Sequence, residues 1–210
     1  MMRQLTLINL RQHHSHSGED SDQWYTPNTP EQPILKLVAL ALGGVIGLDP
    51  TSDPDCRTPA RRHITESENC LAQQANGETI FCNPPFSTPL PFMRWVIDQV
   101  ESGRSPQAIM LCKIGVLSNQ GTGALIRDHC SASCEWMHNG RIRFIPGDGV
   151  LTRLEREFSQ GKRKAPTVNG ADFDCVLLNF GCTEQRFIHV FEPYGNVALR
   201  PTGLRRGWCP

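Results

Sequence analysis

The first long apolar stretch of the chain predicts a buried helix followed by a short strand. Its apolar residues recur at helical spacing, at Ile34, Leu35, Leu37, Val38, Ala41 and Leu42. Thr29 and Gln32 precede the stretch at capping-box spacing, and Gly43-Gly44 follows it as a stop signal. We expect residues 45–48 to be a strand that ends at Asp49-Pro50, because proline interrupts strand pairing.

A second strand and helix are predicted beyond a long polar stretch, which we expect to be a loop. The β-prone run 79–82 leads directly into Asn83-Pro84-Pro85-Phe86, so this strand stops abruptly. One apolar helix face then follows, formed by Phe92, Trp95, Val96, Gln99 and Val100. Asn83 is thereby predicted to begin a turn between a buried strand and an amphipathic helix.

The second half of the chain continues this alternation. Residues 108–112 predict a buried strand, and residues 121–129 predict a short helix. Asn139-Gly140 lies between alternating apolar residues, which is a strong signal for a β-hairpin over 134–144. The remaining segments are expected to be a loop at 147–170 and closing strands at 175–180 and 187–191.

This order of elements predicts an α/β fold with a mostly parallel sheet flanked by helices. In such sheets, ligands bind in a crevice at the carboxyl ends of the strands. Asp49 and Asn83 each follow a predicted strand directly. We therefore expect both side chains to lie near one cleft.

Length and composition favour a single folded domain. The chain has 210 residues, of which 39% are hydrophobic, and this is enough for one core. We expect the domain to cover residues 22–195, between a disordered polar tail at 1–21 and a second tail at 196–210. Residues 1–10 lack the apolar core of a secretory signal, and no apolar run has the length of a membrane span.

The charges balance overall but not locally. The chain has 21 basic and 21 acidic residues, so its net charge does not point to a polyanionic partner. Residues 141–164, however, hold seven basic residues against three acidic ones. A strip that binds phosphates is therefore compatible with this segment.

Nine cysteines are present, but no Cys-x-x-Cys pair occurs. In a chain of this length without a secretory signal, we expect reduced thiols and a cytoplasmic location. The nearest approach to a metal pattern is Cys130, Cys134 and His138, which lacks the fourth ligand of a structural zinc site. We therefore expect no metal site.

The tetrapeptide Asn83-Pro84-Pro85-Phe86 suits chemistry on the exocyclic amine of a base. The amide oxygen of Asn83 and the backbone carbonyl of Pro84 can each accept one amine hydrogen, which directs the nitrogen lone pair toward a methyl donor. Prolines fix the loop, and the ring of Phe86 can stack on a flipped base. The same four residues can also form an ordinary turn, so the tetrapeptide does not decide the function by itself.

The order of five short blocks resembles the phage-type DNA adenine N-6 methyltransferase (Dam-like) family over residues 22–195. The blocks are Trp24-Tyr25-Thr26-Pro27, Leu48-Asp49-Pro50, Thr65-Glu66 to Leu71, Asn83 to Phe86, and Gly140-Arg141-Ile142-Arg143-Phe144. The resemblance implies a Rossmann-like methyltransferase fold that uses S-adenosylmethionine (SAM) as methyl donor. Its implied partner is double-stranded DNA, in which adenine is the acceptor, and no obligatory protein partner is evident.

The resemblance also implies roles for individual residues toward SAM. Trp24, Thr26 and Pro27 would line the pocket for its methionine end, although Trp24 can equally anchor the segment to the core. Asp49-Pro50 would lie beside its amino group, where a carboxylate can accept a charge-assisted hydrogen bond. The plain alternative for this pair is a turn that ends a strand. Glu66 would bind the ribose hydroxyls.

The chain departs from expectation in the predicted cofactor loop. The segment Thr51 to Asp55 contains no glycine that would let the backbone approach SAM. Cys70 also stands where relatives have glycine before Leu71. Because of these two departures, the sequence alone does not decide whether the chain binds SAM.

Arg141 and Arg143 are candidates for DNA binding. On one strand they would share a face and could meet phosphates, although paired surface arginines are often only solvated.

Three functions remain compatible with the sequence. The first is the DNA adenine methyltransferase, for which the resemblance implies a phage role in shielding DNA from restriction. The second is an amino-methyltransferase acting on RNA or on protein glutamine, because both chemistries use the same tetrapeptide. The third is a non-catalytic descendant that keeps the fold and binds DNA or a partner.

Overall fold

The computed structural model describes residues 24–162, 173–181 and 184–199. The predicted tail at 1–21 lies outside these residues. The chain divides into two compact units, one comprising Met1–Trp24 and Pro146–Val168, the other Tyr25–Ile145 and Asn169–Pro210. In the described part, the smaller unit holds one helix, α4 (Asp148–Ser159), and the larger unit holds the main sheet.

Seven strands form the main sheet in the order β3-β2-β4-β5-β8-β6-β9. Their bounds are β2 Ile46–Ser52, β3 Ala60–Thr65, β4 Ile80–Cys82, β5 Gln107–Lys113, β6 Ala132–Trp136, β8 Cys175–Gly181 and β9 Gly195–Leu199. Pairings from β3 to β5 are parallel, whereas those of β8 with β5 and β6, and of β6 with β9, are antiparallel. The sheet is therefore mixed rather than mostly parallel. Two short strands, β1 (Trp24–Tyr25) and β7 (Ile145–Pro146), form a separate sheet.

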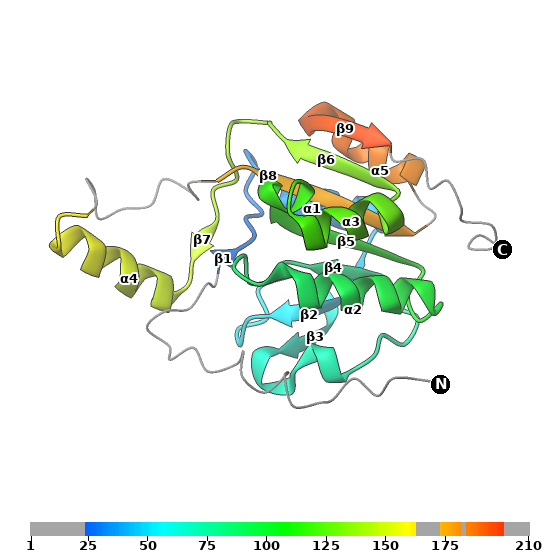
Figure 1. Cartoon of the computed structure of the whole chain (residues 1–210), viewed down its shortest axis with the longest axis horizontal. Coiled ribbons are helices and arrows are strands. Elements are labelled where there is room, and N and C mark those ends of the chain that lie inside the picture. Colours follow the sequence, from blue (N-terminus) through cyan, green and yellow to red (C-terminus); the bar gives the residue numbers. More distant parts are fainter. Residues whose placement is uncertain (1–23, 163–172, 182–183, 200–210) are drawn as a thin grey trace. The chain divides into compact units, whose positions relative to one another are not determined.

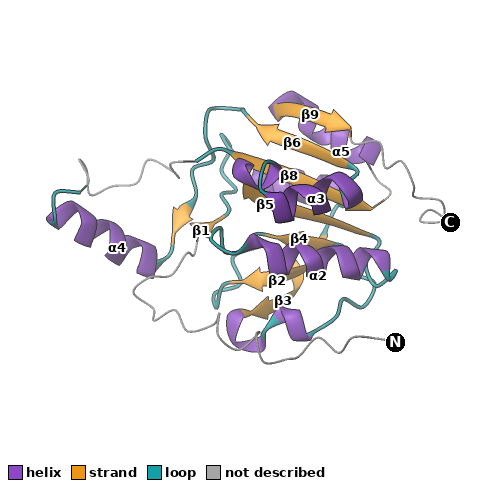
Figure 2. Ribbon diagram, viewed as in Figure 1, coloured by secondary structure: helices purple, strands orange, loops and turns teal. Residues whose placement is uncertain are grey.

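Helices cover both faces of the main sheet (Figures 1 and 2). Helix α2 (Pro89–Glu101) packs against α3 (Gln120–His129) over the face turned to the viewer, and α1 (Ile34–Ala41) packs against α5 (Glu184–Phe191), which lies behind the sheet. Short 3-10 turns lie at Glu66–Glu68, Cys70–Ala72, Ile114–Leu117 and Glu192–Tyr194. No helix in the described ranges is both long enough and apolar enough to cross a membrane.

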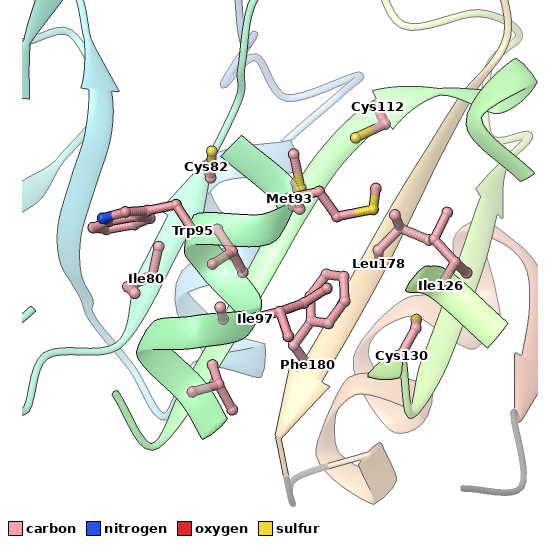
Figure 3. Close-up of a cluster of buried hydrophobic side chains, with 14 of the residues drawn as sticks. Ile80, Cys82, Met93, Trp95, Ile97, Cys112, Ile126, Cys130, Leu178 and Phe180 are labelled. Carbon is pink, nitrogen blue, oxygen red and sulfur yellow. The ribbon is translucent and has the colours of Figure 1, made fainter. Parts of the chain in front are cut away.

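The core under α2 follows from the alternation of side chains along the strands. Ile80 and Cys82 of β4 join Leu178 and Phe180 of β8 in one buried cluster with α2, shown in Figure 3. Phe81, between the first pair, is equally buried, because alternate strand residues point to the opposite face. The central strands are thus apolar on both faces, which positions their carboxyl ends rigidly.

Most predicted elements are confirmed, including α1, β4, α2, β5, α3 and β8. Gly43 and Gly44 end α1 with positive φ angles of 95° and 108°. The Thr29 hydroxyl accepts a hydrogen bond from the Gln32 backbone, as in half of a capping box, but the helix begins only at Ile34. The Gln32 side chain does not complete the box, because it hydrogen-bonds to the backbone of Arg141 and Arg143.

Strand β2 does not stop at Asp49-Pro50 as predicted. It continues to Ser52, with a register shift between Asp49 and Ser52 in its pairing with β3. Such an irregularity accommodates Pro50, which has no N–H to donate. The polar stretch beyond it, predicted to be a loop, contains the edge strand β3, where Ile64 is the single buried residue.

Two other segments differ from expectation. The predicted loop at 147–170 contains α4, whereas residues 163–170 lie outside the described part. The predicted strand at 187–191 is the second half of α5, in which Phe187 and Phe191 pack against each other one helical turn apart. The sheet then continues through β9 to Leu199, beyond the expected domain end at residue 195.

The predicted hairpin over 134–144 is wrong, although its turn is right. Asn139 and Gly140 both have positive φ angles, as a tight turn of this kind requires. The chain beyond the turn cannot pair with β6, because β8 and β9 occupy both edges of that strand. The backbone of this segment instead forms hydrogen bonds with the side chain of Gln32.

Candidate functional site

Three neighbouring strands of the parallel half end at the same edge of the sheet. From β2 the chain moves to β3 on one side and then to β4 on the other, so the strand order reverses between β2 and β4. The carboxyl ends at such a reversal form the usual ligand crevice of α/β sheets. Asn83 directly follows β4, as the sequence predicted, whereas Asp49 lies within β2, three residues before that strand ends.

Thr51 connects Asp49 with Asn83. The Thr51 hydroxyl donates to Asp49 Oδ1 at 3.2 Å and accepts from the Asn83 backbone nitrogen at 3.1 Å. The Thr51 backbone nitrogen also donates to Asp49 Oδ1, at 2.9 Å. One side chain therefore joins the end of β2 to the start of the loop after β4. Sequence reasoning passed over Thr51, for which the only signal was its position two residues after Asp49.

The carboxyl group of Asp49 is buried, with 4% of the residue exposed. Burial raises its pKa, and hydrogen bonds from Thr58 and Thr51 and the proximity of His63 oppose that rise. A buried carboxylate that is held by neutral donors is suited to receive a cationic group. Pro50, next to it, is also buried.

The loop Asn83-Pro84-Pro85-Phe86 makes a tight connection into α2. The Thr88 backbone nitrogen donates to the Pro85 carbonyl at 3.1 Å, and Pro89 begins the helix. Pro at this position is favourable because the first helical N–H has no partner within the helix. Pro84 is buried, Asn83 is half-buried, and the Asn83 side-chain oxygen itself is inaccessible to solvent.

Phe86 lies in a cluster of three phenylalanines. Its ring centroid is 5.2 Å from that of Phe144 and 4.9 Å from that of Phe173, both in edge-on geometry. The Lys113 ammonium lies 4.3 Å from the Phe173 centroid and 5.6 Å from that of Phe86. Only 7% of Phe86 is exposed, so a base reaches its ring only where one of these neighbours gives way. Stacking by Phe86 stays a prediction.

Glu66 lies directly after β3, at the same edge of the sheet. It is exposed and begins a 3-10 turn in which Thr65 and Glu68 form a capping box, and these hydrogen bonds lower the pKa of Glu68. Cys70 follows in the next 3-10 turn and is buried, which raises the pKa of its thiol to about 12. The left-handed conformation in this loop is adopted by Asn69, so Cys70 needs no glycine-like geometry.

Arg141 and Arg143 are both exposed, while Ile142 and Phe144 between and after them are buried. Arg141 Nε donates to Asp174 Oδ1 at 3.0 Å. The Gln32 side chain holds this segment: its Nε2 donates to the Arg141 carbonyl and its Oε1 accepts from the Arg143 nitrogen, each at 2.8 Å. The segment is not a strand, so the common face expected for the two arginines stays a prediction.

The first block is divided between the two units. Trp24, half-buried, belongs to the smaller unit, whereas Thr26, half-buried, and Pro27, buried, belong to the larger one. Next to them, the Tyr25 ring lies 4.1 Å from the Arg57 guanidinium carbon, and Arg57 also pairs with Asp53 and Asp55. This network ties the loop after β2 to Tyr25, a contact that the sequence did not suggest.

Among the described residues, no group of three or more His, Cys, Asp or Glu side chains could hold a metal ion. The seven described cysteines are all free thiols. Cys130 and Cys134, of the weighed zinc pattern, are buried and donate to the carbonyls of Ala132 and Phe191.

Comparison with known proteins gives a family match. A family model described as DNA N-6-adenine-methyltransferase (Dam) matches residues 14–160. This range contains Asp49, Thr51 and the whole of the Asn83–Phe86 loop. No curated protein matches the chain.

Proposed function

Because the chain belongs to the DNA N-6-adenine-methyltransferase family, we propose that it transfers a methyl group from SAM to the exocyclic amine of an adenine flipped out of double-stranded DNA. The observation that carries this proposal is the hydrogen-bonded chain Asp49–Thr51–Asn83 at the reversal of strand order. It couples the end of β2, where a donor would bind, to the loop that would hold the acceptor. The mixed sheet flanked by helices is compatible with a Rossmann-like methyltransferase fold.

The donor side has the chemical groups that SAM needs. Asp49 offers a buried carboxylate to its ammonium, Glu66 offers an exposed carboxylate at the end of β3 to its ribose, and Pro50 shapes the wall between them. Thr26 and Pro27 of the larger unit are proposed to line its methionine end. When bound, SAM supplies an electrophilic methyl group on a sulfonium sulfur.

Glycine is not needed for this binding mode. The single glycine of β2, Gly47, faces the two residues before β4: a Cβ there would come within 2.7 Å of Glu78 Cβ and 2.8 Å of the Thr79 carbonyl oxygen. That glycine serves strand packing. We infer that recognition of SAM in the glycine-free segment Thr51–Asp55 depends on side chains rather than on close approach of the backbone.

On the acceptor side, the loop positions the amine. Once the groups that cover the buried Asn83 side-chain oxygen move aside, this oxygen and the Pro84 carbonyl each accept one hydrogen of the amine, which turns the nitrogen lone pair toward the donor. Asn83 does not act as a base, so the amine proton leaves to water. Phe86, with its two phenylalanine neighbours, provides the aromatic wall of the base pocket, and Arg141 and Arg143 contact phosphates outside it.

Transfer of radiolabelled methyl from SAM to unmethylated duplex DNA, followed by digestion to nucleosides, tests the proposal. We expect label in methyladenine and its loss in Asn83→Ala. Asn76→Ala, which changes an exposed asparagine in a loop, should keep wild-type activity. Label in cytosine, or only in RNA or protein, contradicts the acceptor. Absence of SAM binding in a calorimetric titration contradicts an enzyme of this kind and favours a non-catalytic DNA-binding protein.

A further inference from the structure

Lys113 occupies a position that neither the motif blocks nor the family assignment explains. It is the last residue of β5, the strand next to β4, and the pairing of Cys82 with Met110 places both strand ends at the same edge of the sheet. Lys113 is half-buried and borders the loop that begins at Asn83. A cation therefore stands at the edge of the proposed base pocket.

The Lys113 ammonium is held by aromatic rings rather than by a carboxylate. It lies over Phe173 at 4.3 Å and over Phe86 at 5.6 Å from the ring centroids. Within the described residues it has no salt bridge, and the nearby Asp174 carboxylate is paired with Arg141. An ammonium can donate three hydrogen bonds, and ring faces satisfy them less well than anionic oxygens do.

The ring faces are also where a flipped base has to enter. Phe86 is almost fully covered, so a base that stacks on it displaces one of its neighbours. Phe144 and Phe173 are bulky and packed, whereas a lysine head group on a four-carbon stem moves easily. The displaced ammonium then needs an anionic partner, and the phosphate of the flipped nucleotide arrives together with the base.

We propose that Lys113 binds the DNA phosphate adjacent to the target adenine, exchanging its contact with Phe86 and Phe173 for that phosphate when the base enters. The proposal rests on the proposed function, because it assigns a residue to the acceptor side of the same site. It makes Lys113 a DNA-binding residue separate from Arg141 and Arg143. These arginines are exposed, whereas Lys113 touches the motif itself.

The charge of Lys113 can be removed with little change in shape. Lys113→Met keeps an unbranched side chain that packs well on aromatic rings, and Lys113→Arg keeps the charge. Lys36→Met is the matched control, because Lys36 is exposed on α1 and, within the described residues, its side chain makes no hydrogen bond or ion pair. All four proteins, including the wild type, would be compared for kcat/KM toward unmethylated plasmid DNA over a series of KCl concentrations.

Loss of one phosphate contact has a distinctive signature. A plot of log(kcat/KM) against log[KCl] should become shallower by about 0.9 in Lys113→Met, and kcat/KM at low salt should fall roughly tenfold or more. Lys113→Arg should restore most of the slope, and Lys36→Met should match the wild type. SAM affinity, measured by calorimetry without DNA, should be the same in all four.

Two results would overturn the assignment of Lys113. One is a salt dependence of Lys113→Met equal to that of the wild type, which would leave Lys113 as a packing residue. The other is a loss of SAM affinity in Lys113→Met, which would indicate a disturbed fold or donor site. Failure of the wild type to methylate DNA would instead reject the proposed function, so the two failures are distinguishable.

Discussion

The Thr51 hydroxyl oxygen lies 3.1 Å from the backbone nitrogen of Asn83 and accepts its hydrogen bond. These two residues are 32 positions apart in the chain, and their contact crosses from the end of β2 to the start of the loop after β4. The same hydroxyl donates to Asp49. The proposed donor and acceptor sides therefore share one hydroxyl group, and this makes Thr51 a positioning residue.

Replacing Thr51 with valine keeps the shape of the side chain and removes the hydroxyl. The Asn83 N–H loses its partner, which should lower the free energy of unfolding by about 1–3 kcal/mol. Because the Asn83 loop would no longer be held against β2, we expect kcat for methyl transfer to fall more than SAM affinity. Thr51→Ser should restore kcat. Equal kcat in the valine variant and the wild type would show that the contact does not position Asn83.

Replacing Asp49 with asparagine should raise the melting temperature at pH 8 and lower the affinity for SAM. Burial raises the pKa of the Asp49 carboxyl above its ordinary value of 3.8. A raised carboxyl pKa means that the folded chain holds the proton more tightly than the unfolded chain. The stability that this group contributes is complete below pH 3.8 and is lost as the pH rises through the raised value.

Asp49→Asn removes this pH dependence and keeps an oxygen that can accept from Thr51. We expect its melting temperature to exceed that of the wild type at pH 8, and the difference to shrink as the pH approaches 3.8. SAM affinity should fall roughly tenfold to a hundredfold, because a charged hydrogen bond is lost. Asp128→Asn, on an exposed residue of α3, is the control for both measurements. A variant that melts lower at pH 8 but binds SAM normally would contradict both expectations.

Gln32 should matter for the acceptor side although it belongs to no motif. Its side chain holds the backbone at Arg141 and Arg143, and Phe144 directly beyond them packs on Phe86. Gln32→Met keeps the volume and leaves two backbone groups without these partners, at a cost of about 1–3 kcal/mol in unfolding free energy. We expect KM for DNA to rise and SAM affinity to stay unchanged. Gln160→Met, on an exposed position after α4, should alter neither quantity.

Thiol reactivity should follow burial. Burial raises the pKa of Cys70, Cys134 and Cys175 to about 12, so at pH 8 each is a protonated and shielded thiol. Cys56 is exposed. We expect a brief treatment of the native protein with iodoacetamide, followed by peptide mapping, to alkylate Cys56 and spare these three. Urea-unfolded protein is the control in which all four react, and rapid labelling of Cys70 in the native protein would show that its loop opens.

The sequence predicted those parts of the fold that depend on local patterns. Ile80 to Cys82 is a strand, and α2 buries the predicted Trp95, Val96 and Val100, because periodicity and flanking turn residues act within a few positions. That Asp49 and Asn83 lie on neighbouring parallel strands was also predictable, because the rule for parallel sheets needs only the order of elements, but the continuation of β2 beyond Asp49 to Ser52 was not.

What could not be predicted depends on partners distant in the chain. β3 is polar because it lies at the sheet edge, where Ile64 alone is covered, so it lacks the signature of a buried strand. The Asn139-Gly140 turn is present as expected, but no hairpin forms, because β8 and β9 already pair with both edges of β6. Gln32 was assigned to a helix cap from its spacing, whereas its side chain recognises a segment 109 residues away.

The absence of glycine after Asp49 has a consequence for how this site changes over time. Contacts made by the backbone are insensitive to most substitutions, because every residue carries the same amide. In the proposed binding mode, the carboxylates of Asp49 and Glu66 recognise SAM and the Thr51 hydroxyl positions Asp49, so each contribution depends on one side chain that a single mutation can change. Single mutations can therefore weaken or retune the preference for the methyl donor in small steps while the sheet beneath stays intact.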